Sequence, residues 1–299
     1  MRTASAVALL AAALALAGCG GNEEATPTAE PSPTSTYTAP VVPPPVIADY
    51  LPNLSASLFF PEGATDGPTN ASTHVPLVVM VPGGGWLTAD PTGLDGLARH
   101  LSGAGIAAMP VRIRGARDGV TYPVPVEDIL CAAAYGVATA TDRGLDVGPV
   151  VLLGHSSGAH LSSLAVLATD AYTDGVAETC PWAPVTPDAL IGLSGPYDVT
   201  MLAEVAELLF KSLPDEDPAT WEAGNPLNLA GLRPDVPVLL VHGAADEVVP
   251  QVFTANFAAA LEAGGHDVTV EVLDGLNHGD VLLPQNSGDI IADWVEALP

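Results

Sequence analysis

A short polar segment, GHSSG starting at Gly154, lies between an apolar run and an amphipathic one, and it constrains the fold more than any other feature. Residues 150–153 (VVLL) are apolar and β-branched at their start, as expected for a strand buried on both faces of a parallel sheet. From Ser157 onward, apolar residues recur at helical spacing. A direct turn from strand to helix leaves space only for glycine two positions before and after its apex, and Gly154 and Gly158 fill these positions. The pattern therefore predicts that Ser156 is a nucleophile held on a strained turn above a sheet.

The rest of the chain alternates strands with helices, which is typical of a parallel sheet with helices on both faces. We expect strands at 55–60, 76–81, 106–113, 150–153, 189–195, 236–243 and 268–273, and helices at 93–105, 125–140, 157–168, 251–265 and 288–298. The sequence thus predicts an α/β fold with a mostly parallel sheet of about eight strands. The spacing of apolar residues in 199–233 predicts a short amphipathic helix that lies over the pocket as a small cap.

The N-terminal segment indicates export. Residues 1–18 combine a basic start with an apolar stretch too short to span a bilayer, as in a signal peptide. Leu16 to Cys19 (LAGC) looks like a bacterial lipobox, which makes Cys19 the expected lipidated first residue of the mature protein. The alternative is an ordinary signal peptide that is cut nearby. Both place the mature chain outside the cytoplasm. We expect residues 19–48, rich in Pro and Thr, to form an extended tether and residues 49–299 to form the folded domain.

The formal net charge is -27, and this excludes some partners. Such an acidic surface repels phosphate backbones, so no nucleic-acid partner is expected. It also opposes adhesion to anionic lipid, so the lipid on Cys19 is the expected membrane attachment. The sequence does not predict an oligomeric state.

The chain has three cysteines. With Cys19 assigned to the lipobox, Cys131 and Cys180 remain as an even pair in an oxidising compartment, where a disulfide is expected. The alternative is two buried free thiols. Two cysteines without a histidine at ligand spacing do not predict a metal site, and no cofactor is expected.

A serine nucleophile needs a base and an acid, and in open α/β sheets such groups gather beyond the carboxyl ends of the strands. The loop after strand 236–243 offers Asp246, and the loop after strand 268–273 offers His278. Their order along the chain, Ser-Asp-His, is the order of α/β-hydrolases. Glu247 and Asp274 are the alternative acids.

The other histidines are less suitable as the base because of their positions. His266 precedes its strand and should lie at the opposite end of the sheet. His160 lies one turn into the helix after Ser156, and His242 precedes the acid and should support its loop. His155, inside the turn, is expected to line the pocket.

Backbone N–H groups are needed where an oxyanion forms. The sequence predicts donors from Gly84 and Gly85 in the glycine-rich loop PGGGW and from Ser157, directly after the nucleophile. Trp86 and Tyr197 are expected to line the substrate pocket with His155.

Five motifs in order carry a resemblance to a known family: PGGGW (82–86), GHSSGAH (154–160), GLSGPYD (192–198), HGAADEVVP (242–250) and GLNHGD (275–280). Together they resemble the bacterial esterase branch of the α/β-hydrolases, with its hormone-sensitive-lipase-like, feruloyl-esterase-like and kynurenine-formamidase-like members. The similarity extends from about Pro76 to the C-terminus. Pro82 departs from that branch, which usually has histidine before the three glycines.

The resemblance implies hydrolysis of a small-molecule carboxylic ester through an acyl-enzyme on Ser156. The glycine loop next to Trp86 and the short cap favour a short acyl group, roughly acetyl to hexanoyl. Each methylene of the acyl chain adds binding energy only until the pocket is full. A flat aromatic acyl group that stacks near Trp86 or Tyr197 is the alternative. Two other functions stay open at this point: an amidase or peptidase on the same scaffold, and a non-catalytic binding protein of the cell envelope.

Overall fold

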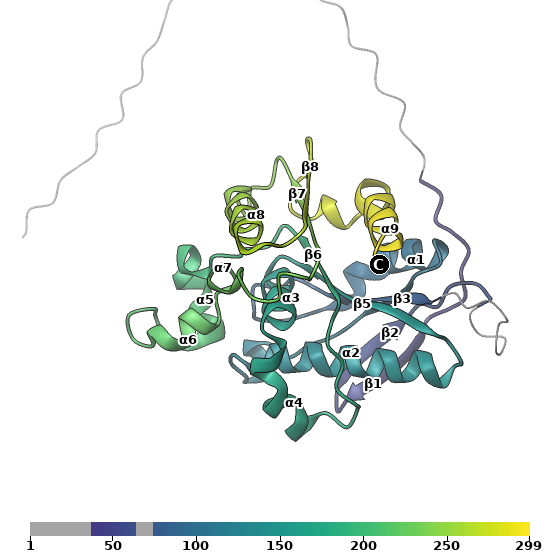
Figure 1. Ribbon diagram of the computed structural model, residues 1–299, viewed down its shortest axis with the longest axis horizontal. Coiled ribbons are helices and arrows are strands. Elements are labelled where there is room, and N and C mark those ends of the chain that lie inside the picture. Colours follow the sequence, from purple (N-terminus) through teal and green to yellow (C-terminus); the bar gives the residue numbers. More distant parts are fainter. Residues whose placement is uncertain (1–36, 64–73) are drawn as a thin grey trace, which may run out of the picture. The chain divides into compact units, whose positions relative to one another are not determined.

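Six parallel strands form the central sheet of the computed structural model, which describes residues 37–63 and 74–299 (Figure 1). Their order is β4-β3-β5-β6-β7-β8. The strands are β3 (Val75–Val81), β4 (Ala107–Pro110), β5 (Val147–His155), β6 (Ala189–Leu193), β7 (Val238–Gly243) and β8 (Val268–Leu273). The predicted signal peptide, Cys19 and the predicted tether as far as residue 36 lie outside the described residues.

The strands are apolar on both faces because helices cover both faces of the sheet. Along β3, Leu77 and Val79 pack into one hydrophobic cluster, and Val78 and Met80 pack into the other. The first cluster includes residues of α2 (Val124–Asp142), α3 (Ser157–Leu167) and α8 (Val252–Gly264), and the second those of α1 (Asp95–Gly103) and α9 (Asp289–Glu296). This alternation explains why the sequences of the inner strands are continuously apolar, whereas the exposed edge strand β8 (VTVEVL) is not.

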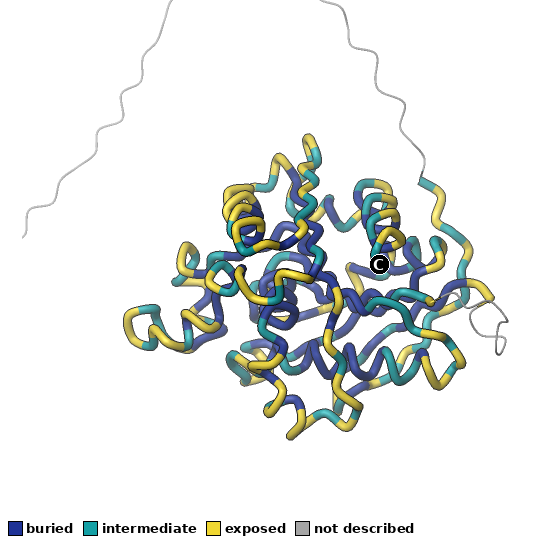
Figure 2. Tube along the Cα trace, in the orientation of Figure 1, coloured by how far each residue is buried: buried dark blue, intermediate teal, exposed yellow. Residues whose placement is uncertain are grey.

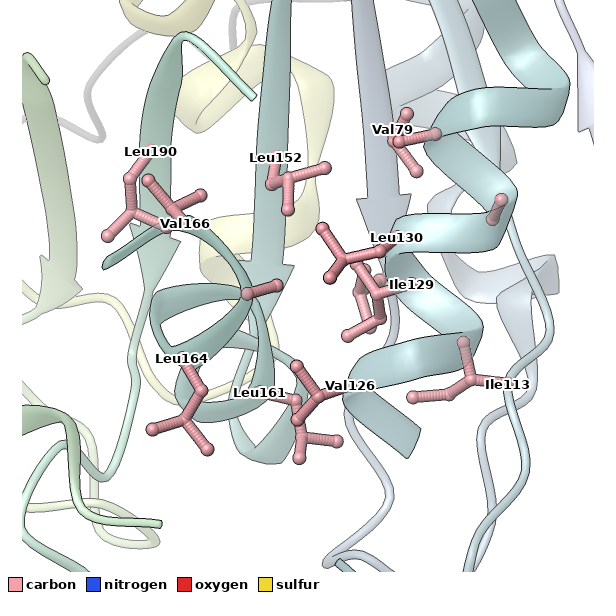
Figure 3. Packing of buried hydrophobic residues seen from close by; sticks show 14 of the residues in the cluster. Val79, Ile113, Val126, Ile129, Leu130, Leu152, Leu161, Leu164, Val166 and Leu190 are labelled. Atoms are coloured by element: carbon pink, nitrogen blue, oxygen red, sulfur yellow. The ribbon is translucent and has the colours of Figure 1, made fainter. Parts of the chain in front are cut away.

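Strands β3 to β7 and helix α3 are deeply buried, whereas the edge strand β8 has no buried residue (Figure 2). A close view shows how the first face is filled: Ile129 and Leu130 of α2 lie beside Leu152 of β5, and Leu161 and Leu164 of α3 lie on the same side (Figure 3). Full burial of such a side chain contributes about 2 kcal/mol, so this face fixes α3, and with it the segment before α3, against the sheet.

A single sheet of about eight strands does not form. Instead, β1 (Val46–Leu51) and β2 (Leu54–Leu58) make a separate antiparallel pair. Isolated bridges, Ala56 with Val111 and Phe59 with Ala108, place this pair beside β4. The additional strands therefore join the edge of the sheet at β4 through isolated antiparallel bridges and not through a continuous ladder.

The folded domain also begins earlier than the predicted boundary at residue 49. Strand β1 starts at Val46, and residues 38–299 form one compact unit. The side chain of Pro40 lies against α1, where a Cβ on Gly103 would come within 2.6 Å of it. The prolines directly before Val46 were the reason to extend the predicted tether to residue 48. In the structure, however, residues 46–48 pair with β2.

The segment 199–233 contains several short helices in place of one. These are η4 (Val199–Leu202), α5 (Ala203–Phe210), α6 (Pro218–Ala223) and α7 (Pro226–Leu229). The other short elements are η1 (Pro91–Leu94), η2 (Ala116–Asp118), η3 (Thr169–Tyr172), α4 (Thr173–Thr179), η5 (Asp280–Leu282) and η6 (Pro284–Gly288).

A disulfide joins Cys131 in α2 to Cys180 directly after α4, with the two Cα atoms 5.5 Å apart. Among the described residues, none of the helices has the length and apolar character needed to cross a membrane.

Candidate active site

The candidate site lies where the order of the sheet reverses. The chain leaves β3 toward β4 on one side and continues from β5 toward β6 on the other, so the loops after β3 and β5 diverge and open a crevice. A cavity of about 410 Å³ occupies this place. Its walls are formed by residues 82–85, Asp90, Gly93, Leu94, His155, Ser156, Val248, His278 and Leu282.

Ser156 occupies the predicted turn between β5 and α3. Its φ of 53° lies in the left-handed region, which a non-glycine residue adopts only at a cost. A Cβ on Gly154 would collide with the backbone of Gly158 and Ala159, and one on Gly158 would collide with the carbonyl groups of Val81 and Pro82. The two glycines are therefore required by close backbone contacts, as the spacing predicted.

Asp246 and His278 are brought together from the loops after β7 and β8. Nδ1 of His278 lies 2.7 Å from Oδ2 of Asp246, whose side chain is buried. Neither Glu247 nor Asp274 provides this bond. With Nδ1–H donating to the carboxylate, Nε2 of His278 carries the lone pair that a base requires.

The carboxylate of Asp246 is held in its charged form. Oδ1 accepts hydrogen bonds from the backbone N–H groups of Val248 and Val249, each at 2.9 Å. Burial is the largest influence and acts to raise the pKa of Asp246, but the bonds from Val249, His278 and Val248 together hold that pKa below its ordinary value. The acid therefore stays ionised across the range in which a histidine base works.

His242 supports this loop, as its position in the sequence suggested. Its Nε2 donates to the carbonyl of Val249 at 2.9 Å and lies 3.5 Å from Oδ2 of Asp246. Its Nδ1 therefore accepts from the hydroxyl of Thr254 at 2.7 Å. Burial lowers the pKa of His242, so this imidazole is a neutral support and not a second base.

Ser156 and His278 line the same cavity. In the described part of the chain, no hydrogen bond joins Oγ of Ser156 to the imidazole of His278. In unliganded hydrolases this bond is often long and shortens only when substrate is bound.

The loop after β3 approaches the nucleophile through its glycines. A Cβ on Gly83 would lie 2.9 Å from Cβ of Ser156, and Gly84 and Gly85 have φ values of 153° and 58°. Within residues 37–63 and 74–299, no protein acceptor takes the N–H of Gly84 or Gly85. The N–H of Ser157 is the first of α3, where helix geometry provides no partner. These three groups are the predicted oxyanion donors. The close approach of Gly83 was missed, although it belongs to the same glycine run.

Trp86 is not a wall of the cavity that Ser156 lines, but with Pro82 and Ser157 it lines a smaller pocket. Its indole Nε1 donates to Nδ1 of His160 at 3.1 Å, and Nε2 of His160 donates to the carbonyl of Gly224 at 2.9 Å. Burial lowers the pKa of His160 to about 4, so this ring is neutral. Trp86 has a φ of 60°, and its indole contacts the ring of His160 in α3 edge-on, with the ring centroids 5.4 Å apart. Trp86 therefore anchors the glycine loop.

Tyr197 is also not a pocket residue. Its side chain is fully buried and stacks on Phe257 with the ring centroids 4.3 Å apart. The apolar contact with α8 determines where this ring lies, and no local sequence pattern contains that information.

His155 does line the cavity, as predicted. Its ring lies 4.7 Å from the ring of His278, and its Nε2 lies 2.9 Å from the carbonyl oxygen of His278. Burial lowers the pKa of His155 to about 4.

No described residue of 199–233 lines the cavity of Ser156, although Leu209 of α5 lines the smaller pocket with Trp86 and Ser157. Instead, α5 packs beside Tyr122, whose N–H donates to the carbonyl of Leu209 at 3.0 Å, and Phe210 packs on Trp221. Besides Gly83, the cavity walls that the sequence missed are Asp90, Gly93, Leu94, Val248 and Leu282. Their only signal was their position after β3, β7 or β8.

A larger cavity of about 600 Å³ lies at the opposite ends of the strands and is lined by none of the predicted site residues. In the part of the chain that the structure describes, no group of three or more His, Cys, Asp or Glu side chains is arranged to hold a metal ion.

Comparison with known proteins places this geometry in context. The model of the BD-FAE family matches residues 66–261, more than half of the chain, including Ser156 and Asp246. A probable isoprenylcysteine alpha-carbonyl methylesterase of Oryza sativa subsp. japonica is 26% identical over 233 residues, 72% of this chain and 54% of that protein. Esterase LipQ of Mycobacterium tuberculosis is 26% identical over 234 residues, 74% of this chain and 54% of that protein. The chain thus spans about half the length of the curated relatives it matches.

Solved structures share the fold. A truncated carbohydrate esterase from gut microbiota has a TM-score of 0.69 and 21% identity, covering 87% of this chain and 96% of that one. Est2 of Thermogutta terrifontis with bound propionate has a TM-score of 0.67 and 21% identity, covering 86% of this chain and 95% of that one. These structures show that the predicted α/β-hydrolase fold is present.

Proposed function

Because the chain belongs to the BD-FAE family and places Ser156 and the His278–Asp246 pair around one cavity, we propose that it is a serine esterase. Its substrates are short-acyl carboxylic esters. The observation that carries the proposal is the bond of 2.7 Å between His278 and Asp246 at the cavity that Ser156 lines. The esterase names of the curated relatives support the same activity.

In the first step, Oγ of Ser156 attacks the ester carbonyl and its proton passes to Nε2 of His278. Asp246, ionised and bonded to Nδ1, stabilises the imidazolium that forms. The negative charge on the carbonyl oxygen is received by the N–H groups of Gly84, Gly85 and Ser157. The tetrahedral intermediate then collapses, His278 returns the proton to the leaving alcohol, and an acyl-enzyme remains on Ser156.

In the second step, His278 removes a proton from water, which attacks the acyl carbonyl. The same N–H groups stabilise the second intermediate, and its collapse returns the proton to Oγ of Ser156 and releases the acid. Each of the chain's residues in this scheme occupies a loop at the carboxyl end of a strand, so all of them are held by one rigid sheet.

The size and walls of the cavity support a short acyl group. Its volume of about 410 Å³ is shared by the acyl and alcohol parts, and Leu94, Val248 and Leu282 bound it with apolar surface. Each buried methylene contributes about 0.8 kcal/mol until the chain meets a wall. Solved forms of Thermogutta terrifontis Est2, which shares the fold, hold propionate and butyrate.

The proposal includes a place of action. The sequence of residues 1–18 and Cys19 supports export and a lipid anchor on Cys19, followed by a tether that holds the domain away from a bilayer. The disulfide between Cys131 and Cys180 fits an oxidising compartment. Mass spectrometry of the mature N-terminus, with Cys19→Ala as control, tests this part: an unmodified Cys19 would contradict it.

The activity is tested with p-nitrophenyl esters of increasing acyl length, using purified wild-type protein and Ser156→Ala. We expect kcat/KM to rise from acetyl to about butyryl and to fall by octanoyl, and Ser156→Ala to be inactive. A profile that still rises at dodecanoyl would contradict the short acyl group. Stoichiometric labelling of Ser156 by a fluorophosphonate separates an enzyme from a binding protein, and matched anilides separate an esterase from an amidase.

A further inference from the structure

His155 has a contact that the mechanism above does not use. It directly precedes Ser156, and its side chain is almost completely buried. Its Nε2 lies 2.9 Å from the carbonyl oxygen of His278. Because a carbonyl oxygen only accepts, Nε2 of His155 carries the hydrogen and donates it to the backbone of the catalytic base.

The two histidines connect loops that are far apart in the sequence. The ring of His278 is fixed by Asp246, which belongs to the loop after β7. The main chain of His278 is fixed by His155, which belongs to the end of β5. Two separate anchors therefore hold the base, and the second anchor is adjacent in the chain to the nucleophile.

The ring of His155 also lies against the glycine loop that supplies the proposed oxyanion donors. A Cβ on Gly83 would lie 3.0 Å from its Nδ1, so the imidazole fills the space between the glycine loop and the His278 loop. Two other hydrogen bonds stabilise the loop around Asn277 from within. Oδ1 of Asn277 accepts from the N–H of Gly279, and Oδ2 of Asp280 accepts from the N–H of Asn277, each at 3.0 Å. Neither bond reaches β5, so His155 connects this loop directly to the strand that carries Ser156.

We propose that His155 is a positioning residue that sets the distance and direction of the His278 imidazole relative to Ser156 through its hydrogen bond to the His278 carbonyl. The inference rests on the proposed esterase function. Burial keeps the pKa of His155 at about 4, so the ring stays neutral. A neutral ring is needed here, because a positive charge 4.7 Å from the His278 ring would oppose the imidazolium that forms during catalysis.

Substitutions that differ in reach test this role. In His155→Gln, the amide nitrogen is separated from Cα by the same number of bonds as Nε2 of histidine, so it can donate to the same carbonyl. His155→Asn carries the same amide on a chain one bond shorter, and His155→Met has similar length without a donor. We expect Asn and Met to lower kcat about 10- to 100-fold with KM nearly unchanged, because misplacement of a catalytic group costs rate and not ground-state binding. Gln should recover most of the lost rate.

His266 provides the matched control. It is a second buried histidine bonded to a backbone carbonyl, with Nδ1 2.9 Å from the oxygen of Val236, but it lies at the opposite end of the sheet. His266→Met removes an equivalent bond, and we expect a lower unfolding temperature with kcat retained.

The measurements are kcat and KM with p-nitrophenyl butyrate and thermal unfolding of every variant. Gln and Asn variants that unfold at the same temperature but differ in kcat support positioning. Equal losses in Gln and Asn, or wild-type kcat in His155→Met, would overturn it. A wild-type protein that cleaves no ester and is not labelled by the fluorophosphonate would overturn the proposed function first, and the inference with it.

Discussion

The two sides of the site are held by different means. On the nucleophile side, the loops after β3 and β5 meet backbone against backbone, since Gly158 leaves no space for a Cβ beside the carbonyl groups of Val81 and Pro82. On the base side, the loops after β7 and β8 also meet through their backbones, since Gly243 lies against the carbonyl groups of Leu276 and Asn277. The functional side chains there are nevertheless held by hydrogen bonds, with Asp246 accepting from the His278 ring and from the backbone N–H groups of Val248 and Val249.

This difference determines what each side can tolerate. Backbone packing responds to added volume, because a displaced strand moves every residue that follows it. A hydrogen-bonded network responds to a changed donor or acceptor, even where the volume is unchanged. Substitutions can therefore damage the base side without unfolding the protein, but volume added on the nucleophile side should reduce both activity and stability.

The largest effect is expected from removing the base. His278→Ala should lower kcat by about 10⁴-fold or more, because triad residues act as a unit. The unfolding temperature should change little, since the ring is at the cavity surface. Ester turnover and circular dichroism measure the two quantities. His266→Ala is the control, and loss of activity there with retention in His278→Ala would show that the base is wrongly assigned.

Asp246→Asn should have the next largest effect, a loss of about 10³-fold in kcat. The amide keeps the volume and can still accept from Val248 and Val249 through its oxygen, but its NH₂ group would face Nδ1 of His278 and favour the wrong tautomer. Turnover at several pH values is the measurement. If Glu247→Gln causes the loss and Asp246→Asn does not, the acid is Glu247.

Gly158→Ala tests the nucleophile side. The new Cβ would meet the carbonyl groups of Val81 and Pro82, so the loop after β3 must move. We expect a loss of about 10²-fold in kcat together with about 2 to 3 kcal/mol of unfolding free energy. Gly231→Ala is the control, because nothing lies within 4 Å of its Cβ position. A fully stable and fully active Gly158→Ala would refute the backbone-contact account.

The residues that could be predicted from the sequence share a local cause. Ser156 is defined by two glycines, and Asp246 and His278 by their places directly after apolar strands, so the pattern itself contains the information. Trp86 and Tyr197 do not line the cavity of Ser156, because each ring contacts a distant partner, His160 and Phe257, that no local pattern indicates.

The architecture shows the same limit. The parallel strands could be predicted because burial on both faces makes them continuously apolar. The start of β1 was missed because prolines precede it directly, and its pairing with β2 cannot be inferred from composition. The helices of 199–233 were expected over the pocket, but their position depends on contacts with Tyr122 and among their own aromatic residues.

A smaller effect is expected at the anchor of the glycine loop. Trp86→Phe keeps an aromatic side chain, although a smaller one, and removes the indole N–H that bonds to His160, so the loop should loosen without a collision. We expect kcat to fall about fivefold, in line with the loss of one buried hydrogen bond worth about 1 kcal/mol. Trp182→Phe is the matched control, because its indole donates to the carbonyl of Tyr50 away from the site. Equal effects of the two substitutions would argue against a role for Trp86 in the glycine loop.

The last prediction concerns stability and not turnover, namely the pH dependence of unfolding on the nucleophile side. Burial lowers the pKa of His160 from 6.5 to about 4, so between these values the unfolded chain binds a proton that the folded protein does not. The unfolding free energy should therefore decrease as the pH falls from 6.5 toward 4, with His160 contributing at most about 1.4 kcal/mol per pH unit. His160→Gln can still donate to the Gly224 carbonyl but does not titrate in this range, so its stability should depend less steeply on pH. Urea unfolding at several pH values measures both slopes. If the slopes of wild type and His160→Gln coincide, His160 does not stay neutral in the folded protein, and the glycine loop is not anchored by the bond described here.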